Sequence, residues 1–281
     1  MHFTKMHGLG NDFVIINGFK EKLTEDISAL AKAVCHRQLG IGADGLLILS
    51  QSTEADANFD IYNADGSRAE MCGNGIRCAA IFAKKEGISN KSVVPFATLA
   101  GLVKAQIVDE ANNLVKVDMG RPKLATKDIP AAVEAPMIVN VPIIVGHKAY
   151  NLTLVSMGNP HCVLFVEDVL NYPVTTLGPQ IETHDIFPAK TNVEFVQPLG
   201  RNKIRMRVWE RGCGETLACG TGACAATVAA VLNGFCPKGE DVEVVLTHGS
   251  LIINWHEDNS ITMIGPAATV FQGDFDPEDF R

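Results

Sequence analysis

Apolar residues recur at helical spacing in the segment from Thr24 to Arg37. Four of them fall on one face of a helix, namely Ile27, Leu30, Ala31 and Val34. Thr24 stands where an N-cap residue is expected, and the acidic side chains that follow suit the positive end of a helix. The pattern predicts an amphipathic helix capped by Thr24.

Alternating apolar and polar positions indicate strands in two later segments. Residues 93–108, VVPFATLAGLVKAQIV, and residues 242–255, VEVVLTHGSLIINW, each contain a glycine near the middle. Such a pattern is typical of two strands joined by a turn. The segment after Cys219, ACAATVAAVL, is apolar on nearly every side and predicts a helix inside a domain. The helix expected after Cys72 ends in two lysines, so its far end should reach solvent.

One sequence motif occurs twice in the chain. Residues 71–87 read MCGNGIRCAAIFAKKEG and residues 218–234 read ACGTGACAATVAAVLNG. Each has a cysteine followed by Gly-x-Gly and a run of helix formers, with a further glycine fifteen places after the cysteine. Four other pairs of segments match in the same order. They are 61–67 with 208–214, 8–16 with 156–165, 42–49 with 190–196, and 102–119 with 250–264.

The spacing of these matches indicates a duplication. It stays at 147 or 148 residues and falls to 144 only after the last turn. Two copies are too few for a solenoid, so we expect an α+β fold built from two similar domains. The expected domains are 1–119 and 120–265, and 266–281 lies beyond the second copy, where it could complete the first domain.

Composition sets limits on the class of protein. Charged residues make up 20% of the 281 positions and hydrophobic ones 47%, which argues against disorder. The net charge of −8 argues against a nucleic acid as the main partner, although local sites for small anions stay open. The N-terminus lacks the apolar core of a signal peptide, and no apolar stretch approaches the roughly 20 residues of a membrane helix. We therefore expect a cytoplasmic protein that does not enter a membrane.

The chain contains eight cysteines, which we expect to be thiols. No Cys-x-x-Cys pair is present, so neither structural zinc nor another metal site is expected. Five cysteines stand among apolar residues and are expected to be buried and inert: Cys35, Cys78, Cys162, Cys224 and Cys236.

The remaining interest lies in Cys72 and Cys219, each placed where a helix should begin. Free backbone N–H groups and the helix dipole at such a position favour a thiolate and so are expected to lower the thiol pKa. The same N–H groups can hold a carboxylate, and glycine lets it approach closely. A complete G-x-G-x-x-G motif is absent at both cysteine sites, so no nicotinamide cofactor is expected.

Two such units facing one cleft suit inversion of a carbon next to a carboxylate. One thiolate would remove the proton and the other thiol would return a proton to the opposite face. The helix ends would stabilise the charge that develops on the carboxylate, in a site that excludes water.

Several motifs of the chain resemble those of the diaminopimelate epimerase family. They are HGLGNDF (7–13), GIGADG (40–45), YNADGS (62–67), MCGNGIRC (71–78), MGNPHCV (157–163), TNVEF (191–195) and ERGCGETLACGTG (210–222). The resemblance covers most of the chain. It implies a cofactor-independent isomerase that interconverts LL- and meso-diaminopimelate, on the route to lysine and peptidoglycan. It also implies two pseudo-symmetric domains, each a curved, mostly antiparallel sheet around a central helix, with the active site in the cleft between them, and often a homodimer.

Carried over by position, the resemblance assigns roles to individual residues. Cys72 and Cys219 look like the two acid–base residues, and His161 and Glu210 resemble residues near the thiols that tune their pKa. The remaining substrate-binding residues implied are Asn11, Asn63, Gly73, Asn74, Asn159, Asn192, Arg211, Gly220 and Thr221, with Glu210 also among them. Some members have a glutamine where this chain has Gly45, so that contact is either absent here or supplied by water.

Other readings remain open on sequence alone. A proline racemase-like or hydroxyproline epimerase-like enzyme would use the same two-thiol chemistry, and a phenazine-synthesis-type isomerase would share the fold without the paired cysteines. Outside catalysis, the two cysteines could serve a redox switch or an anion-binding protein.

Overall fold

The computed structural model describes residues 1–133 and 135–280 and contains two compact units. Unit 1 consists of residues 1–118 and 264–281, and unit 2 of residues 119–263. The α+β class with two similar copies, predicted from the repeat, is confirmed by the elements of the two units and by the comparisons given below. Among the described helices, none combines the length and the apolar character needed to cross a lipid bilayer.

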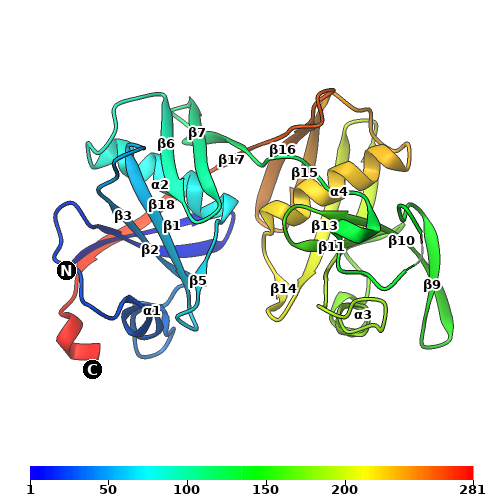
Figure 1. Ribbon diagram of the computed structural model, residues 1–281, viewed down its shortest axis with the longest axis horizontal. Coiled ribbons are helices and arrows are strands. Elements are labelled where there is room, and N and C mark those ends of the chain that lie inside the picture. Colours follow the sequence, from blue (N-terminus) through cyan, green and yellow to red (C-terminus); the bar gives the residue numbers. More distant parts are fainter. Residues whose placement is uncertain (134, 281) are drawn as a thin grey trace. The chain divides into compact units, whose positions relative to one another are not determined.

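The described part of unit 1 is a mostly antiparallel sheet with two α-helices and one short 3-10 helix (Figure 1). Its strands are β1 (His2–Gly8), β2 (Asn11–Asn17), β3 (Gly45–Ser50), β4 (Ala57–Asn63), β5 (Arg68–Ala69), β6 (Val93–Thr98), β7 (Gly101–Asp109), β8 (Leu114–Asp118) and β18 (Ala268–Asp274). Its helices are α1 (Ile27–Cys35), α2 (Gly73–Lys85) and the short 3-10 helix η2 (Pro277–Phe280). The hydrogen-bonded order is β18-β1-β2-β3-β4-β6-β7-β8, in which only β2–β3 and β4–β6 are parallel.

Unit 2 repeats this plan. Its strands are β9 (Val141–Val145), β10 (Lys148–Ser156), β11 (Pro160–Phe165), β12 (Asn192–Gly200), β13 (Lys203–Glu210), β14 (Gly214–Thr216), β15 (Asp241–Leu246) and β16 (Gly249–Trp255). Its helices are η1 (Thr126–Asp128), α3 (Val174–Glu182) and α4 (Gly220–Leu232). The order is β9-β10-β11-β12-β13-β15-β16, and, as in unit 1, only the third and fifth pairings in the order, β11–β12 and β13–β15, are parallel. The strand β17 (Ile261–Pro266) leads from unit 2 back to unit 1.

The end of the chain forms part of the first sheet. Strand β18 pairs antiparallel with β1, with His2 opposite Asp274 and His7 opposite Ala268. In unit 2 the corresponding edge is occupied by β9, which pairs with β10. The buried guanidinium of Arg77 on α2 adds a second link, since its Nε donates to the carbonyl oxygen of Pro266 at 3.1 Å.

Strand alternation gives each sheet two apolar faces. In unit 1, Val14, Ile16, Leu46 and Ile48 pack with the buried face of α1. In unit 2, Cys162, Leu164, Val193 and Phe195 pack with α3 in the same way. Because successive side chains of a strand point to opposite faces, the residues between them are directed to the other side, where α2 and α4 lie. Both central helices are therefore almost wholly buried, as the apolar sequence of α4 predicts.

Most of the sequence predictions for local structure are confirmed. The two strand pairs appear as β6–β7 and β15–β16, and the side chain of Lys85 at the end of α2 is exposed. The predicted cap of α1 is wrong. The N-cap is Asp26, whose carboxylate accepts the backbone N–H of Ala29 at 2.8 Å, whereas the hydroxyl of Thr24 donates to the carbonyl oxygen of Asp26. A carboxylate close to the first turn satisfies an N–H group that Thr24 cannot reach.

Replacing Asp26 with alanine should lower the free energy of unfolding by about 1 kcal/mol, because the helix loses its cap. Urea denaturation of Asp26→Ala and of Thr24→Ala measures this directly. The threonine variant is the matched control and should change stability by less than about 0.5 kcal/mol. Equal losses in both variants would contradict the assignment of the cap to Asp26.

Candidate functional site

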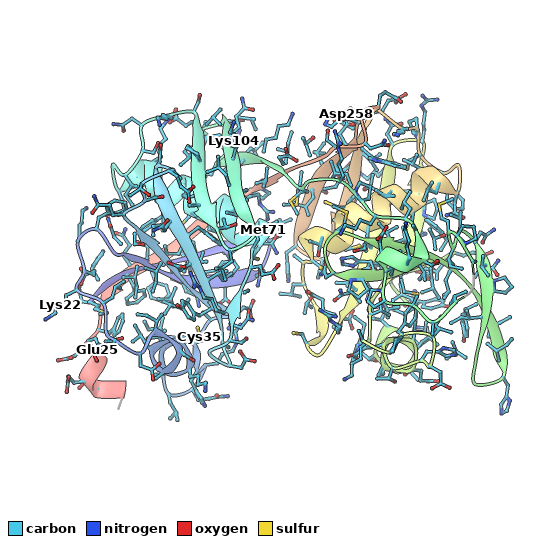
Figure 2. The ribbon with its side chains drawn as sticks, in the orientation of Figure 1. Lys22, Glu25, Cys35, Met71, Lys104 and Asp258 are labelled. Atoms are coloured by element: carbon cyan, nitrogen blue, oxygen red, sulfur yellow. The ribbon has the colours of Figure 1, made fainter. Side chains whose placement is uncertain are left out.

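Cys72 is the N-cap residue of α2 and has an extended backbone, with φ −141° and ψ 116°. The next residues, Gly73 and Asn74, open the helix and are buried, while the cysteine itself is partly exposed. Its Sγ lies 3.7 Å from Oδ1 of Asn11, and Nδ2 of Asn74 donates to the same oxygen at 3.0 Å. The first thiol, the helix start and Asn11 thus form one group in unit 1. Figure 2 labels Met71, the residue directly before this thiol.

An ionic network fixes the amide of Asn11. Its Nδ2 donates to Oδ2 of Asp44 at 2.8 Å, and the other carboxylate oxygen of Asp44 accepts Arg37 at 2.7 Å. Arg37 also bonds Asp12, which in turn pairs with the buried ammonium group of Lys5 at 2.6 Å. With Nδ2 held by a carboxylate, Oδ1 of Asn11 is the atom directed to Cys72 and Asn74.

Two further positions of unit 1 lie at the neighbouring strand ends. Asn63 ends β4 and is exposed, and its Nδ2 donates to Oγ of Ser67 at 2.9 Å. Gly45 is paired with Asn63 across β3 and β4. A Cβ at position 45 would lie 2.9 Å from the carbonyl oxygen of Tyr62, so this backbone has no room for a side chain. The family resemblance left open whether the contact at Gly45 is absent or supplied by water, and the close approach of β4 accounts for a glycine at this position.

Cys219 occupies the same place in unit 2. It is the N-cap of α4, with φ −119° and ψ 111°, and only 5% of its surface is exposed. Its Sγ accepts the backbone N–H of Gly222 at 3.3 Å and lies 3.5 Å from Oγ1 of Thr221. Gly220 and Thr221 begin the helix, as Gly73 and Asn74 do in α2. The second thiol is therefore a capping side chain, which the first is not.

Burial and two neighbouring carboxylates raise the pKa of the Cys219 thiol. Burial raises the pKa of this thiol well above its ordinary value, and the charges of Glu210 and Glu194 raise it further. Hydrogen bonds from Thr221 and Gly222 lower the pKa by less. The expectation that the helix N-terminus leaves this thiol with a lowered pKa is wrong for Cys219, because burial and two carboxylates outweigh the helix.

Glu210 is the carboxylate that hydrogen-bonds to Cys219. It ends β13, and its Oε1 also accepts the hydroxyl of Thr216 on β14. Burial raises the pKa of Glu210, the charge of Glu194 adds to this, and the bonds from Thr216 and Cys219 act in the opposite direction. Glu210 thus lies where its carboxyl group affects the pKa of the Cys219 thiol, which is the position that the family resemblance implies.

Asn159 and His161 reach the same thiol through Thr221. Nε2 of His161 lies 3.0 Å from Oδ1 of Asn159, and Nδ2 of Asn159 donates to Oγ1 of Thr221 at 3.3 Å. The imidazole is wholly buried, and its Nδ1 lies 2.7 Å from Oε1 of Glu194. Sequence reasoning missed Glu194, although a charged residue between Val193 and Phe195 in an apolar strand was a visible signal.

Asn192 and Arg211 form a separate pair at the end of the strands. Oδ1 of Asn192 accepts the backbone N–H of Arg211 at 2.9 Å, and its Nδ2 donates to the carbonyl oxygen of Pro160 at 2.9 Å. The guanidinium of Arg211 is exposed and donates to the carbonyl oxygen of Ala189 at 3.3 Å. Both polar atoms of the Asn192 amide are used within the protein, so its visible role is to hold the loop that carries Arg211.

The other thiols differ from these two. Cys35, Cys78, Cys162, Cys224 and Cys236 are buried, as predicted, and Cys213 is exposed. Burial raises the pKa of Cys35 and of Cys78 to about 12. Figure 2 labels Cys35 at the end of α1. Among residues 1–133 and 135–280, no cluster of three or more histidine, cysteine or acidic side chains has the geometry to hold a metal ion.

A sequence model of the diaminopimelate epimerase family matches residues 3–125 and 153–270 of this chain. The diaminopimelate epimerase of Moorella thermoacetica is 51% identical over 278 residues, which cover 98% of this chain and 99% of that protein.

Solved structures show the same fold at low sequence identity. A PhzF-family phenazine biosynthesis protein of Bacillus anthracis has a TM-score of 0.71 at 15% identity and covers 98% of both chains. A probable proline racemase of Agrobacterium radiobacter has a TM-score of 0.71 at 16% identity and covers 98% of this chain and 92% of its own. At these identities the likeness establishes the fold alone.

Removing the charge of Glu210 should move the titration of Cys219 to lower pH. Carboxylate charge raises the pKa of this thiol, so Glu210→Gln should shift the midpoint of its alkylation-rate profile downward relative to wild type. Peptide mass spectrometry after iodoacetamide pulses over a range of pH measures each thiol separately. The exposed thiol of Cys213 is the internal control and should keep its profile. A midpoint for Cys219 that stays in place or rises would refute this electrostatic assignment.

Proposed function

The chain belongs to the diaminopimelate epimerase family, and from this membership we infer that it is an isomerase that interconverts LL- and meso-2,6-diaminopimelate. The observation that carries the inference is 51% identity over nearly the whole length of a diaminopimelate epimerase. The product of this reaction serves lysine biosynthesis and peptidoglycan precursors. The proline racemase-like alternative is disfavoured, since the relative of that name shares only 16% of its residues with this chain.

The proposed chemistry is a two-base proton transfer at one α-carbon. A thiolate of one cysteine takes the α-proton and becomes a thiol, and the resulting carbanion takes a proton from the thiol of the other cysteine on the opposite face. The configuration inverts, and the two sulfurs exchange their protonation states. We assign these roles to Cys72 and Cys219, with the direction of the reaction deciding which one acts as base.

Helix-start geometry supports this assignment. Both cysteines are N-cap residues, so each stands directly before the first-turn N–H groups of its helix, and in α4 one of these groups, from Gly222, bonds to the sulfur. Gly73 and Asn74 in α2, and Gly220 and Thr221 in α4, are the groups proposed to hold the reacting α-carboxylate, where developing negative charge meets the positive helix ends. The α-carbon is a weak acid, so stabilising the negative charge that develops on the carboxylate lowers the activation barrier to removal of the α-proton.

Polar side chains around each thiol are proposed to bind the rest of the substrate. Asn11, Asn63 and Asn159 supply amide groups, and the exposed guanidinium of Arg211 can take the distal carboxylate in a two-pronged contact. The bond from Asn192 to the backbone of Arg211 supports a positioning role for that asparagine. His161 and Glu210 are proposed to tune the charge near the thiols.

Further proposals rest on the family resemblance. They are a reaction without metal or organic cofactor, a cytoplasmic location and a homodimer. The redox-switch alternative predicts no steady turnover in the presence of a reductant, which separates it from the isomerase.

Incubation of the protein with LL-diaminopimelate in D₂O tests the function. Proton NMR should show loss of the α-proton signal, and chiral chromatography should show the meso isomer. Cys72→Ser and Cys219→Ser should each abolish epimerisation with the fold intact, since a hydroxyl is a far weaker base than a thiol near neutral pH. Circular dichroism and thermal unfolding provide the folding control. Near-normal epimerisation by either serine variant would refute the two-thiol mechanism.

Mild oxidation should inactivate the enzyme reversibly through a bond between Cys72 and Cys219. Two thiols that serve one carbon must be able to approach each other, and a disulfide requires Cα atoms within about 7 Å. Peptide mapping of the oxidised protein identifies the linkage, and bound substrate should protect. The exposed Cys213 is the main competitor, so Cys213→Ser is the matched background. A linkage between other cysteines, or no protection by substrate, would show that the two thiols do not meet.

A further inference from the structure

A carboxylate and an imidazole are buried together beneath the second thiol. Glu194 and His161 are both 0% exposed, and Oε1 of Glu194 lies 2.7 Å from Nδ1 of His161. The other oxygen, Oε2 of Glu194, has no hydrogen-bond partner within the part of the chain that the structure describes. Removing a carboxylate from water is unfavourable unless its partners compensate for the lost hydration. An unfavourable burial of this kind is a reason to look for a functional role of Glu194.

Unit 1 demonstrates that the fold does not need this pair. In the parallel pairing β2–β3, Phe13 is opposite Gly45, and in β11–β12, His161 is opposite Asn192. Phe13 therefore holds the position of His161. Two residues further along β3 and β12, Leu47 holds the position of Glu194. The first copy fills with phenylalanine and leucine the two positions that the second copy fills with histidine and glutamate.

The side chains at these positions reach equivalent places. A Cβ added at Gly75 on α2 would lie 3.5 Å from Cδ1 of Leu47 and 3.5 Å from Cβ of Cys72. A Cβ added at Gly222 on α4 would lie 2.8 Å from Oε1 of Glu194 and 3.2 Å from Sγ of Cys219. Leucine underlies one thiol-bearing helix start and glutamate the other.

Hydrogen-bond acceptors surround the imidazole of His161. Nδ1 faces the carboxylate of Glu194, and Nε2 faces Oδ1 of Asn159. An amide oxygen can only accept, so Nε2 of His161 carries a proton in this arrangement. Asn159, with its oxygen bound to the imidazole, donates from Nδ2 to the hydroxyl oxygen of Thr221. The hydroxyl proton of Thr221 is then available to Sγ of Cys219, 3.5 Å away.

We propose that Glu194 is a positioning residue that fixes the imidazole of His161 with the proton of Nε2 directed to Asn159, and thereby makes Thr221 a donor to the sulfur of Cys219. The proposal rests on the proposed function, because it assigns the orientation of a group beside one of the two acid–base thiols. The chain of contacts runs from Glu194 through His161, Asn159 and Thr221 to Cys219.

The opposite arrangement follows when the carboxylate charge is lost. An imidazole whose proton lies on Nδ1 presents a lone pair at Nε2, so the amide of Asn159 turns and donates to it. Oδ1 of Asn159 then accepts the hydroxyl of Thr221, which no longer donates to the sulfur. A thiolate at Cys219 would lose a stabilising donor. The other charged group in this region is Glu210, which interacts with His161, Glu194 and Cys219.

The variant Glu194→Gln tests this chain by two independent readouts. Nitrogen-15 NMR of histidine-labelled protein should show a protonated Nε2 for His161 in wild type and an unprotonated Nε2 in the variant, while His256, bonded to Thr262, keeps its signals. With LL-diaminopimelate, kcat should fall by roughly 100-fold with KM nearly unchanged, as expected when a group at the reacting centre is misoriented. Glu243→Gln, which removes a carboxylate paired with Lys203 on β13, is the matched control and should behave as wild type in both.

A double variant separates this role from a structural one. His161→Phe with Glu194→Leu gives unit 2 the side chains of unit 1. It should fold with a melting temperature equal to or above that of wild type, since replacing a buried ionic pair by apolar side chains is often neutral or stabilising. Its kcat should nevertheless stay low. Activity near wild type in Glu194→Gln, or an Nε2 of His161 that remains protonated there, would overturn the proposal. Failure of wild type to turn over diaminopimelate would refute the proposed function instead, and the NMR result would still decide the state of His161.

Discussion

The burial of a central helix whose first turn begins at a cysteine is the constraint on which both units depend. Each helix is covered by strands, so its first N–H groups have no water and must find partners within the protein or in a ligand. Gly-x-Gly keeps side chains away from that first turn, and the extended N-cap residue presents its sulfur there. Strand alternation and the parallel junctions β2–β3 and β11–β12 then bring polar side chains to the same place.

The two copies have used this common frame differently. In unit 1, polar groups approach Cys72 from one side, through Asn11 and Asn74, and an ionic network anchored on Asp44 and Arg37 fixes Asn11. In unit 2, carboxylates lie close to Cys219, and burial with those charges raises the pKa of its thiol. Duplication kept the backbone and allowed the chemistry around each thiol to diverge. An isomerase that must remove and return a proton can use two thiols in different electrostatic surroundings.

Family membership and local geometry support the same activity by separate arguments. The relatedness to diaminopimelate epimerases extends over nearly the full chain, whereas the solved structures with this fold share few residues with it. Fold likeness alone leaves several isomerase chemistries open. The cysteine at each helix start, with an amide or hydroxyl side chain two residues further along, is the local feature that favours two-base chemistry.

The sequence by itself determined the duplication, the α+β class and the position of both thiols at helix starts, because repeated local patterns and capping signals are properties of short segments. It did not determine the N-cap of α1, which is Asp26 and not Thr24 because the carboxylate of Asp26 accepts the backbone N–H of Ala29. It also did not determine the raised pKa of the Cys219 thiol. A thiol pKa depends on burial and on carboxylates from other strands, which only tertiary contacts bring together. The pairing of Glu194 with His161 was decided in the same way, since residues 33 positions apart meet only when β11 and β12 lie side by side.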